Sequence, residues 1–123
     1  MQYLLLTYED ENQLAAMSTR ERDAFEQACL ANDEALRTSG HLCAKEALQR
    51  NNTTTVLVHN HKVSVSEGPI SATNEQINGI FCMEARDLNE AIRVAAQMPQ
   101  VRRGPIEVRP LLALTFNHQK GSL

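Results

Sequence analysis

The chain has 123 residues, and its 15 acidic and 12 basic residues give a formal net charge of −3. This length fits one domain over residues 1–123 that is large enough to bury a core of its own. The slight acidity, and an aromatic content of 4% without tryptophan, argue against the basic surface of a nucleic-acid binder and against an aromatic base-stacking platform.

The cysteines and the N-terminal residues indicate the cellular compartment. Cys29, Cys43 and Cys82 are an odd number with no C-x-x-C spacing, which favours reduced thiols over a disulfide framework or a zinc knuckle. The apolar run at residues 1–6 lacks a basic flank and is far shorter than a signal segment or a membrane span. We therefore expect a cytoplasmic protein that binds neither membrane nor nucleic acid.

The first part of the chain predicts a strand and a long helix. Residues 2–8 are a short apolar run typical of a buried strand, and the acidic residues 9–11 are expected in a solvated loop. Ser18 and Glu21 have the S-x-x-E spacing of a capping box. With apolar residues at three- and four-residue spacing after it, this box predicts a helix over residues 19–39.

The middle of the chain predicts strands. Residues 41–48 and 53–59 are strand candidates, and the second is rich in threonine and valine. Asn60 and His61 are expected at the tip of a hairpin whose second strand runs through Val65 and ends at Gly68-Pro69.

The last part of the chain predicts a strand, a helix and a strand. Residues 78–85 are apolar on both faces, as in a central strand. Asp87 is a helix cap, and the apolar stripe after it continues to Pro99. Residues 105–116 predict a long final strand. The whole order is the β-α-β-β-α-β pattern of the α+β, ferredoxin-like fold with an extra β-hairpin in the middle.

Such a fold places both helices on one face of an antiparallel sheet and leaves the other face bare. The final strand alternates apolar and polar residues, which suggests that the bare face is covered. A second copy of the chain is the simplest cover, so we expect a homodimer.

Three segments carry motifs that resemble those of one family. They are the turn at residues 67–70 with the polar loop after it, the segment 84–91, and the ending 104–110. Together they resemble the YCII-related superfamily, in the branch named for a D-G-P-F motif. The resemblance implies a dimeric α+β barrel of ferredoxin-like subunits. It also implies kinship with enzymes of aromatic breakdown that use a His/Asp pair, and an association of many members with extracytoplasmic-function sigma factors.

The chain departs from that pattern at three positions. Glu67 and Ile70 stand where the branch has Asp and Phe. The helix histidine of the enzymatic relatives falls near Cys29, so the His/Asp mechanism does not carry over. Cys29 itself, on a helix face rich in alanine, is expected to be a small core residue rather than a nucleophile.

Four polar residues near the D-G-P-F-like turn are candidates for a ligand site. Glu67, at the end of a strand, suits a general acid or base if a pocket desolvates it, or else it accepts hydrogen bonds from the turn backbone. Thr73, Glu75 and Gln76 either hold a ligand through hydrogen bonds or cap the loop in which they lie.

Arg109 is unusual as an arginine inside the apolar last strand. We expect its partner to be Glu67 or a substrate carboxylate rather than Glu107, or else an outward position at the sheet edge. His59 and His61 share a strand-like spacing, but they flank the hairpin tip without a third ligand and are expected to be exposed. We predict no metal and no cofactor.

Three functions fit these features. The first is a small-molecule-binding homodimer with a pocket between sheet and helices, edged by Glu67, Thr73, Gln76 and Arg109. The second is an enzyme of proton transfer or elimination on a small aromatic or lactone, with Glu67 as base and Arg109 as anion holder. The third is a regulatory partner of a sigma factor.

Overall fold

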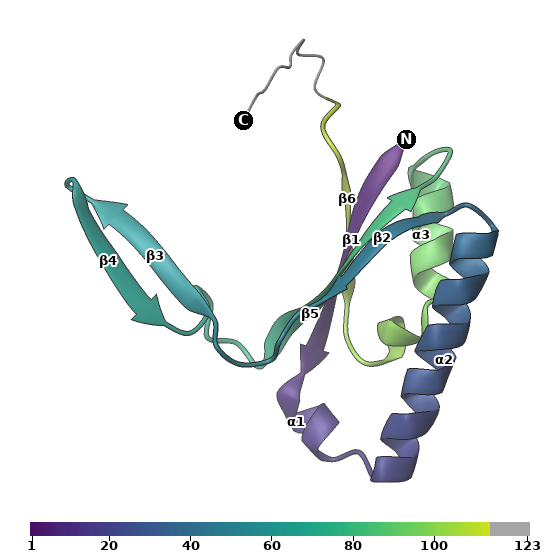
Figure 1. Cartoon of the computed structure of the whole chain (residues 1–123), viewed down its shortest axis with the longest axis horizontal. Helices are drawn as coiled ribbons and strands as arrows, with labels where there is room; N and C mark the ends of the chain where they lie inside the picture. Colours follow the sequence, from purple (N-terminus) through teal and green to yellow (C-terminus); the bar gives the residue numbers. More distant parts are fainter. Residues whose placement is uncertain (114–123) are drawn as a thin grey trace.

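A four-stranded antiparallel sheet is the centre of the computed structural model, which describes residues 1–113 (Figure 1). Its strands, in spatial order, are β2 (Leu42–Ala47), β5 (Glu75–Glu84), β1 (Gln2–Asp10) and β6 (Ile106–Pro110). The helices are α1 (Glu11–Ala15), α2 (Thr19–Thr38), α3 (Leu88–Gln97) and the 3-10 helix η1 (Pro99–Arg102). Two further strands, β3 (Thr54–His59) and β4 (Lys62–Glu67), pair with each other in a separate sheet.

The topology is ferredoxin-like. β1 is paired antiparallel with both β5 and β6, and β5 is paired antiparallel with β2. This is the β-α-β-β-α-β arrangement, with β3 and β4 inserted between the second and third strands of the pattern. The predicted fold and the predicted extra hairpin are both confirmed.

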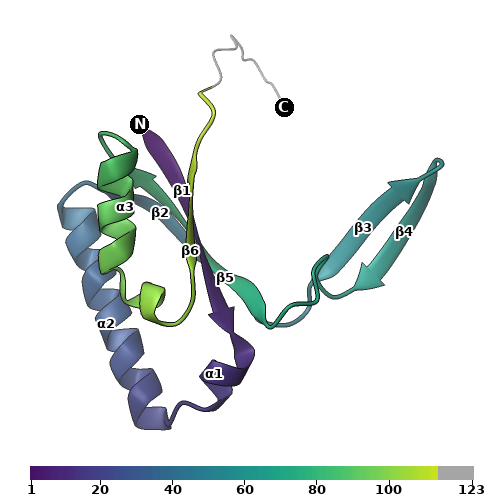
Figure 2. The same ribbon diagram turned by 180° about the vertical axis from the view of Figure 1, so that it is seen from behind.

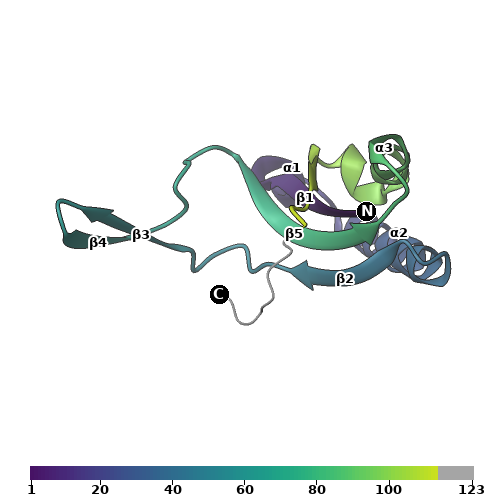
Figure 3. The same cartoon turned by 90° about the horizontal axis from the view of Figure 1, so that it is seen from above.

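The inserted hairpin, residues 54–67, forms an arm that projects from the rest of the protein. Seen from behind, the arm extends away from α2 and α3 (Figure 2). Seen from above, the arm lies at one end of the molecule and these two helices lie at the other (Figure 3). Asn60 and His61 at its tip have φ angles of 51° and 65°. Left-handed conformation at both positions is the geometry of the two-residue turns that suit the twist of a hairpin.

The hydrophobic core lies between the sheet and α3. Tyr3 and Leu5 of β1, with Phe81 and Met83 of β5, are almost completely buried. Full burial of such side chains stabilises the fold by about 1.5–3 kcal/mol each. On α3 the buried residues are alanines, which let the helix pack close to the sheet.

Helix α2 begins as predicted but is held to the sheet mainly by polar contacts. Ser18 and Glu21 form the reciprocal capping box. Asp33 is the buried residue of α2, and its carboxylate is paired with the ammonium of Lys45 on β2. The Lys45 ammonium also lies 5.5 Å from the centre of the Phe81 ring, a cation–π distance.

Three predictions about element ends were wrong. The strand expected to begin at Asn78 begins at Glu75. The acidic residues after the first strand were expected in a solvated loop, but Glu9 and Asp10 end β1, and Glu9 is buried. Asp10 caps α1, which was not predicted. The last strand ends at Pro110 rather than Phe116, and residues 114–116 lie outside the described part of the chain.

Candidate functional site at the base of the arm

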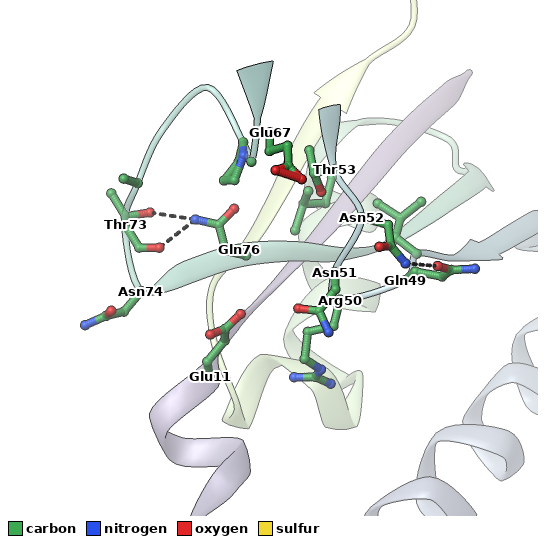
Figure 4. Close-up of a pocket in the computed structure, with 15 residues that line it drawn as sticks. Glu11, Gln49, Arg50, Asn51, Asn52, Thr53, Glu67, Thr73, Asn74 and Gln76 are labelled. Carbon is green, nitrogen blue, oxygen red and sulfur yellow. Dashed lines mark hydrogen bonds between the residues drawn. The ribbon is translucent and has the colours of Figure 1, made fainter. Parts of the chain in front are cut away.

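A polar groove of about 730 Å³ lies where the arm meets the main sheet (Figure 4). Its walls are the segment that joins β2 to β3, the end of β4 with the loop after it, the start of β5 and the first residue of α1. Glu67 lies on the arm side, and Glu11 and Arg50 lie on the opposite side. Glu67, Thr73 and Gln76 therefore share one groove.

Backbone hydrogen bonds fix the arm side of the groove. Gly68 has a φ of 100°, a left-handed conformation that favours glycine. Its amide donates to the Thr53 carbonyl at 2.7 Å, and its own carbonyl accepts from the Thr55 hydroxyl at 2.7 Å. The Gly-Pro turn is thus bound to the strand that enters the arm, which sets the position of Glu67.

The loop between the arm and β5 is held by residues that were candidates for ligand contact. Gln76 Nε2 donates to the carbonyls of Ser71 and Thr73, at 3.1 and 2.6 Å. The Thr73 hydroxyl donates to the Glu75 carbonyl at 2.9 Å. These side chains cap the loop, which was one of the two alternatives for them, and their contact with a ligand stays a prediction.

A chain of hydrogen bonds connects the groove to the interior of the protein. Arg50 donates to the buried carboxylate of Glu9 at 3.3 Å. The same carboxylate oxygen accepts from Asn78 Nδ2 at 2.9 Å, and Asn78 Oδ1 accepts from the Thr7 hydroxyl at 2.6 Å. Arg50 is therefore anchored on one wall rather than free to follow a ligand.

This anchor was not predicted from the sequence. Glu9 was placed in a loop, and Arg50 lies in a connection to which no role was given. The alternation of β1 could have revealed Glu9, since residues two apart on a strand share a face. Glu9 continues the series of Tyr3, Leu5 and Thr7, all of which point into the core.

Arg109 has a different partner from the one expected. Its Nη2 lies 3.3 Å from Glu107 Oε2, and its Nε donates to Oε1 of the same carboxylate at 3.4 Å. The exclusion of Glu107 was wrong, because residues two apart on a strand project from the same side. The hydrogen bonds from Arg109, and next from Tyr8, hold the pKa of Glu107 below its usual value.

Arg109 and Glu75 do not line the groove. Glu75, with Thr73, Tyr8 and Glu107, borders a second hollow of about 350 Å³ beside β6. The expected pocket was between the sheet and the helices, edged also by Arg109, whereas the larger groove lies at the base of the arm. Glu67 is exposed along that groove, so a ligand would have to cover its carboxylate to desolvate it.

Cys29 lies near the buried ion pair under α2. Burial, followed by the charge of Asp33, raises the pKa of its thiol to about 11. At neutral pH this sulfur is protonated, which is unfavourable for a nucleophile.

The side chains and helices of residues 1–113 bear on metal binding and on membrane crossing. No three His, Cys, Asp or Glu side chains there gather closely enough to hold a metal ion, and His59 and His61 are exposed at the arm tip. None of the helices in that range combines the length and the apolar character that crossing a bilayer requires.

The family model of the YCII-related domain matches residues 1–115. The chain belongs to the YCII-related family. Its fold is also that of a solved YCII-like structure, the 5-chloro-2-hydroxyhydroquinone dehydrochlorinase TftG of Burkholderia phenoliruptrix AC1100 in complex with 2,5-dihydroxybenzoquinone. The two share 15% sequence identity with a TM-score of 0.54, over 91% of this chain and 94% of TftG. No curated protein matches this YCII-related chain in sequence.

Proposed function

We propose that this YCII-related protein binds a small, neutral, hydroxylated ring compound in the groove at the base of the arm. The observation that carries the proposal is the mixture of groups that line the groove. Side-chain amides and hydroxyls, two carboxylates and one guanidinium surround it, together with a few apolar side chains. Small-molecule sites combine polar groups, which fix the orientation of the ligand, with apolar contacts.

The polar groups favour hydroxyl substituents on the ligand. A hydroxyl both donates and accepts hydrogen bonds, so it can satisfy a carboxylate such as Glu67 and an amide such as Asn51. The apolar side chains of Leu48 and Ile77 offer contact to a ring. TftG, which has the same fold, is described in complex with a dihydroxylated ring.

The charges favour a neutral ligand over an anion. Glu11 and Glu67 both line the groove, whereas the charge of Arg50 is already matched by Glu9. An anionic ligand would therefore meet two carboxylates and no unpaired cation among the described lining residues.

Titration followed by amide chemical shifts tests the proposal, with hydroquinone and benzoate as ring compounds that differ in charge. We expect hydroquinone to shift the amide signals of residues 67–76 and benzoate to bind more weakly. Glu67→Gln removes a charge-assisted hydrogen bond and should weaken binding about tenfold. Glu46→Gln, on an exposed strand position outside the groove, is the matched control. Shifts that map to the helix side of the sheet would contradict the proposal.

Catalysis is the alternative use of the same groove, because Glu67 presents a carboxylate where a ligand would lie. Glu67 would then remove a proton from a small aromatic or lactone whose leaving group departs in the same reaction. A general base contributes about 10²–10⁴-fold in rate, so Glu67→Gln should reduce turnover of a halogenated hydroquinone by that factor. Binding of that compound without release of halide would leave the protein as a binder only.

We further propose that the protein is a homodimer. The arm presents Val56, Val58, Val63 and Val65 on one face, and these side chains are 60–68% exposed. An isolated two-stranded hairpin is only marginally stable in water, so a second copy that covers the valine face would stabilise the arm. Association with a sigma factor stays a prediction from the family resemblance.

A further inference from the structure

Cys43 and Cys82 lie together on the sheet face opposite the core, in adjacent strands. β2 and β5 pair from Leu42 opposite Met83 to Ala44 opposite Cys82, so Cys43 is an extra residue in β2. In a bulge of this kind two residues of one strand face a single residue of the other. Cys43 and Ala44 therefore both face Cys82.

The burial pattern along β2 agrees with this geometry. Leu42 is buried in the core and Lys45 points inward to Asp33, whereas Cys43 and Ala44 are both exposed. A regular strand would have placed Cys43 and Ala44 on opposite faces. The bulge thus brings the Cys43 side chain to the same sheet face as Cys82, in the neighbouring strand.

We propose that Cys43 and Cys82 are a thiol oxidation site, at which a peroxide joins them in an intramolecular disulfide. The Cys43 sulfur attacks one oxygen of hydrogen peroxide, loses its proton and forms a sulfenic acid while hydroxide leaves and is protonated to water. The Cys82 sulfur then attacks the Cys43 sulfur, and the departing hydroxide takes the Cys82 proton to give a second water. The two sulfur atoms together lose two electrons, and the peroxide gains them.

The environments of the two thiols set this order. Cys43 is exposed, so an oxidant reaches it directly. Burial, and then the neighbouring Cys43, raise the pKa of Cys82, so its thiol is the weaker first nucleophile. The resulting bond would close a loop that contains the whole arm and link edge strand β2 to β5.

Peptide mapping of the peroxide-treated protein under non-reducing conditions tests the proposal. Cleavage after lysine and arginine places the three cysteines in different peptides: residues 23–37, 38–45 and 63–86. We expect 38–45 joined to 63–86, with Cys29 still reduced. Cys29→Ser should preserve the link, and Cys43→Ala, at an exposed position, should abolish it.

The melting temperature gives a second measurement. A disulfide that forms without distortion should raise Tm by about 5 °C or more, reversibly with dithiothreitol, and only when Cys43 is present. Links between two chains, links to Cys29, oxidation of Cys43 to sulfinic acid without a link, or a Tm that does not rise would each overturn the proposal.

Discussion

At the scale of single residues, buried polar groups are the sensitive points of this protein. Asp33 and Glu9 are both nearly inaccessible to solvent, and each carboxylate has one cationic partner. A buried charge is tolerated when it is paired, but removal of the partner leaves the full cost of desolvation. Substitution of Lys45 or Arg50 should therefore lower the free energy of unfolding by more than the partial exposure of these two side chains suggests.

Lys45→Met tests this for Asp33. The change keeps an inward aliphatic chain but removes the ammonium, so we expect a loss of about 3 kcal/mol in the free energy of unfolding, measured with urea. Arg86→Met removes the exposed cation of a pair with Glu90, which also contacts Arg93, and should cost less than about 1 kcal/mol. The double variant Asp33→Leu/Lys45→Met should recover much of the loss. Equal effects of the two single changes would show that the Asp33 charge is not desolvated.

The raised pKa of the Cys29 thiol predicts how its labelling and the stability of the protein depend on pH. Because the pKa of its thiol is about 11, only about 10⁻³ of it is thiolate at pH 8. We expect iodoacetamide at pH 8 to modify Cys43 first and Cys29 last, as measured on the peptides 38–45 and 23–37. The pKa is higher in the folded chain than in the unfolded one, so stability should fall as pH rises from 9 towards 11. Equal labelling rates would mean that α2 opens from the sheet.

At the scale of elements, the arm is the part of the protein with the least support. Its two strands pair only with each other among the described elements, and its valine face is exposed. Both turn residues adopt left-handed conformations, which cost little for asparagine and more for histidine. The stability of the arm should therefore be limited by its turn.

His61→Gly tests the role of the turn. It creates an Asn-Gly pair, the preferred sequence for this geometry, and should stabilise the arm by about 1 kcal/mol. Hydrogen exchange of the arm amides should slow by several fold, while that of β1 and β5 stays the same. His59→Gly, placed in the strand instead, is the control and should accelerate exchange. Unchanged exchange in His61→Gly would indicate that other contacts hold the arm.

At the scale of the whole molecule, the proposed homodimer rests on the exposed valine face of the arm. Leu4, Leu6 and Ile80 lie on the sheet face opposite the core and are partly exposed. They add to the valine face of the arm as apolar surface that one subunit leaves accessible.

Sedimentation equilibrium should give a mass near two subunits. The paired change Val58→Glu/Val63→Lys places opposite charges across the arm, which preserves the hairpin but removes its apolar face, so the mass should fall to one subunit. Leu57→Glu/Ser64→Lys makes the same charge pair on the other face and should leave the dimer intact. A wild-type mass of one subunit would contradict the proposed homodimer.

Local sequence patterns predicted most of the fold. The capping box at Ser18, the turn at Asn60-His61 and the helix cap at Asp87 each depend on residues within a few positions, and all three are observed. They succeed because hydrogen bonds between near neighbours do not require knowledge of distant contacts. The family resemblance likewise agreed with the match of the YCII-related model.

The candidate site was predicted only in part. Glu67, Thr73 and Gln76 do share a groove, since they lie in or directly beside the short loop that joins β4 to β5. Arg50 was missed because its role depends on Glu9, which is far away in the sequence. Arg109 was given a distant partner although Glu107, on the same strand face, is the one it contacts.

By itself, the sequence determined the order of the strands and the two longer helices, the caps at Ser18 and Asp87, and the turn of the arm, because each follows from short-range periodicity and hydrogen bonding. Its motifs indicated the family. Only the tertiary structure decided that the hairpin stands apart as an arm, that Glu9 and Asp33 are buried against Arg50 and Lys45, and that a bulge places Cys43 beside Cys82. These features arise from strand register and from contacts between segments distant in the chain, which no local pattern specifies.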